Sequence, residues 1–180
     1  MSHDHQHQPN SESPPRSPSL SADWPPTYTR PPALICDIDE TIATEFDVPI
    51  LLAVGVLQAI HRPRLTVYYV TARPESTRPA TERFLAEHRL PGWNRVHYCP
   101  TWQSSRQHKR DAHAKIAMEH WVLASIGDSD EEAHAAAATK IPFLRVEYGN
   151  PESAWQELER MLGQLGLLRQ DEDDDPFTIP

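Results

Sequence analysis

The chain has 180 residues, enough for one domain with a hydrophobic core and short tails. Its 17 basic and 26 acidic residues give a net charge of −9. Residues 170–180 hold five acids and no base, and the first 32 residues hold three acids and two bases, so the body carries −3. A body without a broad basic field argues against strong non-specific binding to long nucleic acid, but a short strand end in a local site is still allowed.

Neither a membrane span nor a disulfide framework is indicated. No apolar run approaches the roughly 20 residues that a membrane-spanning helix needs, and the polar N-terminus lacks a signal-peptide pattern. The two cysteines, Cys36 and Cys99, lie in apolar strand-like runs, which is typical of buried thiols. We therefore expect a soluble cytoplasmic protein with no membrane partner. The oligomeric state is left open.

Both ends of the chain differ in composition from the middle. Residues 1–32 carry 8 of the 18 prolines, with Ser, His and Gln between them, which indicates a disordered lead-in. His3, His5 and His7 alternate there, but disordered polar sequence explains them better than a metal site does. Residues 169–180 form an acidic tail, which we expect to be solvated. The folded domain is accordingly expected over residues 33–168.

The first predicted strand, residues 33–36, runs directly into two acids. Its four apolar residues are typical of a strand buried on both faces of a parallel sheet. Asp37 and Asp39 follow it, and extended geometry would point both carboxylates to the same side. Acidic turn residues at a solvated strand end could also account for this pair. The pattern alone does not decide between these interpretations.

Strands and helices alternate through the rest of the chain. The sequence predicts further strands at 65–70, 95–99, 122–126 and 142–146, and helices at 48–60, 75–88, from beyond 110 to about 119, 131–139 and 153–168. The crossovers are long enough for parallel pairing, which predicts an α/β fold: a Rossmann-like, doubly wound sheet of about five parallel strands with helices on both faces. Ligands of such sheets bind outside the carboxyl ends of the strands.

Polar residues gather where three of these strands end. Asp37 and Asp39 follow the first strand, Thr71 follows the second, and Asp128 follows the fourth. Because the carboxyl ends of parallel strands share one edge of the sheet, we expect these residues to form one site.

Taken together, these residues resemble the haloacid dehalogenase (HAD) superfamily of phosphotransferases. The matching pieces are Asp37-Ile38-Asp39-Glu40-Thr41, then Thr71, a lysine before the fourth strand, and Gly127-Asp128-Ser129-Asp130-Glu131-Glu132, in the family's order over about 100 residues. The resemblance implies a Mg²⁺-dependent phosphomonoesterase, a hydrolase that acts on a phosphomonoester substrate.

The resemblance also implies a role for each matching residue. Asp37 would attack phosphorus and form an aspartyl-phosphate, and Asp39 would protonate the leaving oxygen and then activate water. The metal ligands would be the carboxylates of Asp37 and Asp128 and the backbone carbonyl of Asp39, with Glu132 a partner through water. Thr71 would bind a phosphoryl oxygen, although an ordinary strand-end threonine is the simpler reading of that residue alone.

Two lysines compete for the family's phosphate-binding position. Lys109 leaves 12 residues before the fourth strand, which is room for a helix to cross back along the sheet. Lys115 leaves six, and at 1.5 Å per residue it would lie roughly 9 Å further from the carboxyl edge. We therefore expect Lys109 to contact the phosphate and Lys115 to be an exposed helical lysine.

Many HAD relatives carry a cap domain, inserted after the first motif or between the second and third. Here residues 43–69 are taken up by one helix and one strand, and residues 71–109 by one helix, one strand and a loop. We therefore expect no cap and an open site, as in members that act on macromolecules or borrow a lid from a partner.

The stretch Thr71-Ala72-Arg73-Pro74-Glu75 resembles the phosphatase domain of bacteriophage polynucleotide kinase/phosphatase. Relatives commonly have Gly in place of Ala72. The resemblance implies a 3′-phosphate end of nucleic acid as substrate, with Arg73 clamping a phosphate oxygen. An arginine in a helix-capping salt bridge is the plainer alternative for Arg73. No Gly-rich P-loop occurs, so the kinase half of such an enzyme is absent from this sequence.

Two other functions stay open at this point. An open site could admit a small phosphomonoester such as a nucleotide or sugar phosphate. The same fold could also serve as a non-catalytic phosphate-binding module, although every acid expected of the enzyme is present.

Overall fold

A computed structural model of the chain describes residues 30–44 and 47–169. The expected disordered lead-in and acidic tail, with His3, His5 and His7, fall almost wholly outside the described residues. Among the described helices, none combines the length and apolar character needed to cross a membrane.

The centre of the fold is a sheet of five parallel strands in the order β3-β2-β1-β4-β5. The strands are β1 (Pro32–Cys36), β2 (Thr66–Pro74), β3 (Val96–Cys99), β4 (Trp121–Gly127) and β5 (Phe143–Arg145). The first strand, β1, lies in the middle of the sheet. The strands β2 and β3 are added on one side of it, and β4 and β5 on the other. The switch point of this doubly wound fold therefore lies between β1 and β4, beside Asp37. The predicted α/β fold class is confirmed.

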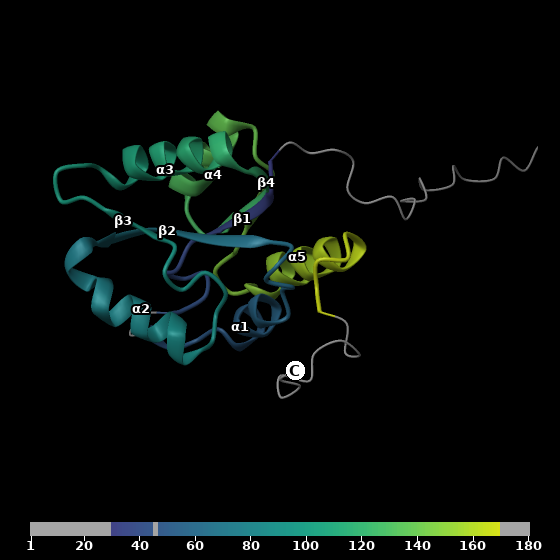
Figure 1. The fold of residues 1–180 in the computed structure, drawn as a ribbon. Coiled ribbons are helices and arrows are strands. Elements are labelled where there is room, and N and C mark those ends of the chain that lie inside the picture. Colours follow the sequence, from purple (N-terminus) through teal and green to yellow (C-terminus); the bar gives the residue numbers. More distant parts are fainter. Residues whose placement is uncertain (1–29, 45–46, 170–180) are drawn as a thin grey trace, which may run out of the picture.

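Helices cover both faces of the sheet (Figure 1). The helical elements are α1 (Leu51–Gln58), the 3₁₀ turn η2 (Glu75–Thr77), α2 (Arg78–Glu87), α3 (Ser105–Glu119), α4 (Asp130–Thr139) and α5 (Glu152–Gln164). The helices α1, α2 and α5 pack on one face, and α3 and α4 pack on the other. Alternate residues of β1 pack against the two helix layers. Leu34 and Cys36 face α1, α2 and α5, and Ala33 and Ile35 face α3 and α4.

Two element boundaries differ from the predictions in ways that affect the site. Helix α3 begins at Ser105, well before the predicted start, because the Ser104 side chain caps it by accepting from the Gln107 backbone N–H at 3.3 Å. Strand β2 continues to Pro74, so Thr71 lies within the strand and not after it. The predicted cysteine environment is confirmed: Cys36 and Cys99 are buried free thiols.

Between β1 and β2 the described residues form turns, isolated bridges, a 3₁₀ position at Asp47 and α1, and between β2 and α3 they form η2, α2 and β3. No inserted domain interrupts either described segment. Trp155 of α5 is fully buried and donates its indole N–H to the Thr41 carbonyl at 3.1 Å, so this helix braces the turn that follows β1.

Candidate active site

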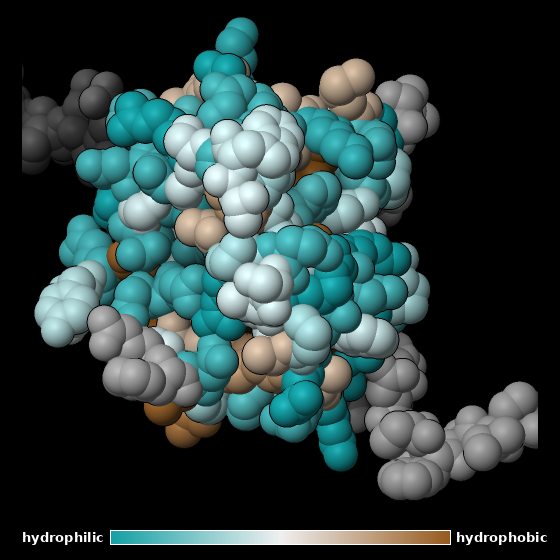
Figure 2. Space-filling model, turned by 90° about the vertical axis from the view of Figure 1, so that its left-hand side faces the viewer, coloured by the Kyte–Doolittle hydropathy of each residue, from teal (hydrophilic) through white to brown (hydrophobic). Residues whose placement is uncertain are grey.

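The predicted site residues meet at the carboxyl edge of the sheet. The start of α3 and the loop before it lie at this edge, on the left of Figure 1, and Figure 2 looks onto that side. The surface there is mostly hydrophilic, with small separate hydrophobic areas. A polar or charged ligand therefore suits this face better than an apolar partner does.

Asp37 lies at the bottom of the site, one residue beyond β1. Its backbone N–H donates to the Ile126 carbonyl of β4 at 3.0 Å, and the residue is 4% exposed. Burial raises the pKa of the Asp37 carboxyl to about 7, and the nearby ammonium of Lys109 opposes that rise. A buried carboxylate is costly unless cations compensate it, so the surroundings of Asp37 determine what it can do.

Lys109, in the second turn of α3, is the cation that faces Asp37. It is 3% exposed, its Nζ lies 3.6 Å from Asp37 Oδ1, and it also forms an ion pair with Glu132 of α4. Lys115 is exposed further along the same helix. The early start of α3 is what brings Lys109 to the sheet edge.

Three carboxylates converge beside this lysine. Each of Asp37, Asp128 and Glu132 offers an oxygen, and these oxygens lie within 4.8 Å of one another. Among the described residues, the buried oxygens Asp37 Oδ1 and Glu132 Oε1 have no hydrogen-bond partner apart from their ion pairs with Lys109. When all three carboxylates are ionised, they leave an excess of two negative charges over the one lysine, which a divalent cation would balance. Hard oxygen ligands of this kind suit Mg²⁺, so the residues fit the metal that the sequence predicts. The Asp39 carboxylate is not a member of this cluster.

Glu132 is held in place by the start of α4. The Ser129 side chain and the Glu132 carboxylate form a capping box, in which the Ser129 backbone N–H donates to Glu132 Oε2 at 3.0 Å. The second carboxylate oxygen is thereby left for Lys109 and the carboxylate cluster. A side chain at Gly127 would meet Glu132 Cγ at 2.7 Å, so only glycine admits this packing. The Ser129-x-x-Glu132 spacing was visible in the sequence as a capping-box signal, but the sequence analysis did not use it.

The outer part of the site is a network centred on Arg73. Its guanidinium donates from Nε to Asp39 Oδ1 at 3.0 Å, from Nη2 to Asp39 and Asp47 at 2.6 Å each, and from Nη1 to Thr81 at 3.1 Å. Thr71 Oγ1 lies 3.5 Å from Asp39 Oδ2 and accepts from the Arg73 backbone N–H at 3.1 Å. Arg73 thus holds acidic side chains of the site and does not cap a helix.

A bulge in β2 sets the directions of the Thr71 and Arg73 side chains. Val70 pairs with His97 and Pro74 with Cys99, so three residues of β2 lie opposite one residue of β3. Bulges of this kind re-aim side chains and are common next to active sites. Here the bulged residues include both Thr71 and Arg73. The sequence carries no glycine or repeat that would have revealed the bulge.

A buried histidine that the sequence did not single out lies behind Lys109. His113 is fully buried, its Nδ1–H donates to the Lys109 carbonyl at 2.7 Å, and its Nε2 accepts from the Ser125 hydroxyl at 2.9 Å. Burial lowers the pKa of His113 to about 4, although the bond to the Lys109 carbonyl opposes this. A neutral His113 therefore ties the second turn of α3 to β4 at physiological pH. No sequence pattern separated this histidine from the nine others.

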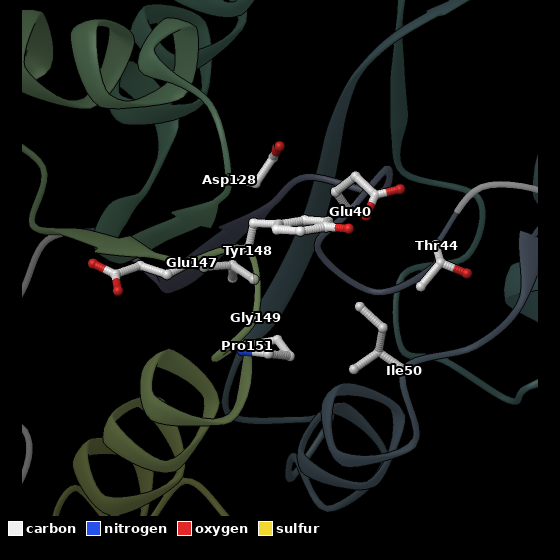
Figure 3. A pocket seen from close by; sticks show the side chains of 9 residues that line it. Glu40, Thr44, Ile50, Asp128, Glu147, Tyr148, Gly149 and Pro151 are labelled. Atoms are coloured by element: carbon white, nitrogen blue, oxygen red, sulfur yellow. The ribbon is translucent and has the colours of Figure 1, made fainter.

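A cavity of about 250 Å³ opens beside the carboxylate cluster, between the β1–α1 turn and the β5–α5 loop (Figure 3). Asp128 belongs to both the cluster and the cavity wall. The other lining residues are Glu40, Thr44, Ile50, Val146, Glu147, Tyr148, Gly149 and Pro151.

No family model matches the sequence, and no curated protein matches it either. Solved structures do resemble the fold. A chain in a structure of the Pnkp1/Rnl/Hen1 RNA repair complex matches with a TM-score of 0.59 at 19% identity, covering 74% of this chain and 47% of that chain. A second structure of the Pnkp1/Rnl/Hen1 complex matches with a TM-score of 0.57 at 17% identity, covering 81% of this chain and 57% of that chain.

The chain thus spans about half the length of these two structural relatives. A class C acid phosphatase from Bacillus anthracis gives a TM-score of 0.47 at 14% identity, covering 81% of this chain and 83% of that chain. At these identities the likeness shows a shared fold, and the chemistry has to be argued from the site itself.

Proposed function

We propose that the protein is a phosphomonoesterase of the HAD type, with Asp37 as the nucleophile. The observation that carries this proposal is the buried arrangement of Asp37 between Lys109 and two further carboxylates, Asp128 and Glu132. A phosphate monoester repels an anionic nucleophile until cations neutralise it. Lys109 supplies one positive charge at this point, and the carboxylate cluster is suited to hold a second cation.

The metal we propose is Mg²⁺, held by the carboxylates of Asp37 and Asp128 and the backbone carbonyl of Asp39. Glu132, which already bonds to Lys109, would complete the surroundings through water. When bound, Mg²⁺ would supply charge neutralisation for the phosphoryl oxygens. It would also offset the burial that raises the pKa of Asp37, so that this carboxylate is ionised when substrate arrives.

The proposed reaction has two steps. Asp37 attacks phosphorus, the bond from phosphorus to the ester oxygen breaks, and Asp39 gives a proton to that leaving oxygen. Asp39 then takes a proton from water, which attacks the aspartyl-phosphate and releases inorganic phosphate with Asp37 regenerated. Thr71 and Lys109 would hold phosphoryl oxygens in both steps.

Arg73 has two roles in this proposal. Its contacts with Asp39 orient the acid and base, and together with the bond to Asp47 they occupy three of its five N–H donors. Nη1 has two N–H groups and gives one to Thr81, so one is left among the described contacts to clamp a phosphate oxygen.

The substrate we propose is the 3′-phosphate end of a nucleic acid, reached through an open site without a cap. A groove of about 320 Å³ between the first two turns of α3 and the later turns of α4 supports it, because Arg106, Arg110 and His134 line the groove. Arg106 has no hydrogen-bond or ion-pair partner among the described residues and is exposed. A neighbouring phosphodiester of a strand would bind there. The likeness to a chain of an RNA repair complex is in keeping with this choice.

The first experiment tests the chemistry. Hydrolysis of p-nitrophenyl phosphate is measured with Mg²⁺ for the wild-type protein and for Asp37→Asn. We expect turnover by the wild type, its loss in excess chelator, and a loss of about 10³-fold or more in the variant, since removing a nucleophile abolishes the covalent route. A fluoroaluminate or beryllium fluoride adduct at Asp37 would separate this enzyme from a non-catalytic binding module. Full activity in Asp37→Asn would refute the mechanism.

The second experiment tests the substrate. Turnover of a 3′-phosphorylated oligonucleotide is compared with that of its mononucleotide and of sugar phosphates. We expect the oligonucleotide to be preferred, and Arg106→Ala with Arg110→Ala to remove most of that preference at low salt, where phosphate contacts count most. Lys115→Ala, an exposed change further along α3, is the matched control. Equal turnover of oligonucleotide and mononucleotide would leave a small-molecule phosphatase as the better description.

A further inference from the structure

The cavity beside Asp128 has a composition that the phosphoryl chemistry does not explain. Its walls combine the apolar surfaces of Ile50, Val146 and Pro151 with the carboxylates of Glu40 and Glu147. Among the residues that the structure describes, its lining includes no lysine or arginine. In contrast to the groove at Arg106, this cavity would repel a second phosphate and would accept an uncharged group.

The most exposed large side chain at this cavity is an aromatic one. Tyr148 has a relative exposure of 101%, and in Figure 3 its ring reaches from the β5–α5 loop toward Glu40. A ring exposed to this degree makes little contribution to the core, since it gains no burial on folding. It is available to a ligand that enters the cavity.

The backbone holds this ring at the cavity mouth. The Asn150 N–H donates to the Glu147 carbonyl at 3.0 Å, which closes a four-residue turn with Tyr148 at its second position. Gly149 at the third position has φ +88°, and Tyr148 is not among the residues with positive φ, as a type II turn requires. The direction of the Tyr148 side chain is therefore defined by a hydrogen-bonded turn, although the ring itself is exposed.

We propose that this cavity is the leaving-group site and that it takes the nucleobase of a terminal nucleotide, stacked on the ring of Tyr148. The inference rests on the proposed phosphatase function and deepens it. The shared residue Asp128 places the cavity next to the proposed phosphoryl site. A nucleobase is planar and uncharged, and its exocyclic amino groups and the sugar hydroxyls can donate to the carboxylates of Glu40 and Glu147. Base stacking on an aromatic side chain strengthens binding by about tenfold or more.

The test compares two esters of secondary alcohols, adenosine 3′-phosphate and glycerol 2-phosphate, of which only the first carries a base. For the wild type we expect a higher kcat/KM with the nucleotide. Tyr148→Ala should lower the ratio of the two kcat/KM values about tenfold, mainly through KM, and Tyr148→Phe should keep it, because the ring and not the hydroxyl stacks. Trp93→Ala, a change at a half-exposed aromatic on the loop before β3, is the control.

A binding measurement keeps this inference separate from the phosphatase proposal. Equilibrium dialysis of adenosine 3′-phosphate against Asp37→Asn, alone and combined with Tyr148→Ala, reports on the cavity without turnover. A Kd about tenfold weaker in the double variant supports the inference, whether or not the wild type hydrolyses any ester. An unchanged Kd and an unchanged kcat/KM ratio would overturn it, even for an active phosphatase.

Discussion

The two halves of the site are built on different physical principles. In the inner half, Asp37, Lys109 and Glu132 are all nearly inaccessible to solvent. Asp37 directly follows β1, and the other two lie on α3 and α4. In the outer half, Arg73 joins Asp39 and Asp47, whose side chains are 48% and 39% exposed. Electrostatic interactions are strong where water is excluded and weak where it is not.

This difference separates two tasks. The inner half concentrates charge that has to be compensated before the protein is stable, and the same charge is what would bind a metal and a phosphoryl group. The outer half orients a side chain at little cost in folding energy, so it can exchange contacts when substrate arrives. Changes in the inner half should therefore affect stability and metal binding together. Changes in the outer half should affect catalysis more than stability.

The largest effect is expected for Lys109→Met. Removing this ammonium leaves Asp37 and Glu132 buried without their cation, and breaking a buried ion pair in this way costs about 3–5 kcal/mol. Urea unfolding should show this loss, and Mg²⁺ should restore part of it by balancing the same carboxylates. The matched control is Lys115→Met, an exposed change on the same helix. Equal stability of the two variants would contradict the account of the inner half.

The next effect is the pH dependence caused by His113. Its pKa is about 4 in the folded protein and near 6.5 when unfolded, so the unfolded chain takes up the proton first as the pH falls. The contribution of the neutral His113 to the free energy of unfolding is therefore fully present above pH 6.5. It is lost as the pH falls from 6.5 to 4, by about 3 kcal/mol at most. Urea unfolding at several pH values would measure this loss.

The ionisation of Asp37 changes stability in the opposite direction over part of this pH range. Its pKa is raised from 3.8 to about 7, so ionising it as the pH rises lowers stability. The difference between the wild type and His113→Gln cancels this contribution and isolates the histidine. If the two proteins show parallel pH curves, His113 is not held neutral in the fold.

A smaller effect is expected for Gly127→Ala. The added methyl group would meet Glu132 Cγ at 2.7 Å and force that side chain away from Lys109, which should cost about 1–3 kcal/mol and weaken Mg²⁺ binding. Gly55→Ala is the control, because nothing lies within 4 Å of its added atom and it sits inside α1. That change should stabilise the protein by about 0.5–1 kcal/mol. If Gly127→Ala changed neither the free energy of unfolding nor Mg²⁺ binding, Glu132 would be free to move away from the added methyl group.

The sequence predicted the inner half better than the outer half, for a physical reason. A strand buried on both faces needs an unbroken apolar run, so 33–36 placed Asp37 at the carboxyl edge. The spacing of Lys109 from β4 likewise follows from the fixed rise of a helix. Within a strand or helix, the spacing along the sequence determines where each residue lies in space. The residues of the inner half lie on or directly beside such elements.

The outer half depends on irregular backbone, which leaves no periodic signal. The bulge at Thr71 and Arg73 and the positive φ of 52° at Glu40 set the directions of these side chains. The partnership of Arg73 with Asp47 joins residues 26 apart through a loop. The sequence indicates a phosphate clamp or a helix cap for Arg73, and neither role predicts its bonds to Asp39.

The smallest effect on stability is expected for Arg73→Ala. Its ion pairs with Asp39 and Asp47 are partly exposed, so their loss should cost about 1 kcal/mol or less. Turnover should respond more strongly, because Asp39 loses the partner that orients it. An aryl phosphate has a leaving group that needs little protonation, whereas an alkyl ester needs a well-placed acid.

We therefore expect Arg73→Ala to lower kcat about 10-fold to 100-fold with glycerol 2-phosphate and by much less with p-nitrophenyl phosphate. Arg73→Lys is the sharper variant, since it keeps the charge but cannot make the paired bonds to Asp39. If the bonds matter, Arg73→Lys should resemble Arg73→Ala; if only charge near the phosphate matters, it should resemble the wild type. An equal loss with both esters would instead place Arg73 on the phosphoryl group in both reactions, because that contact does not depend on the leaving group.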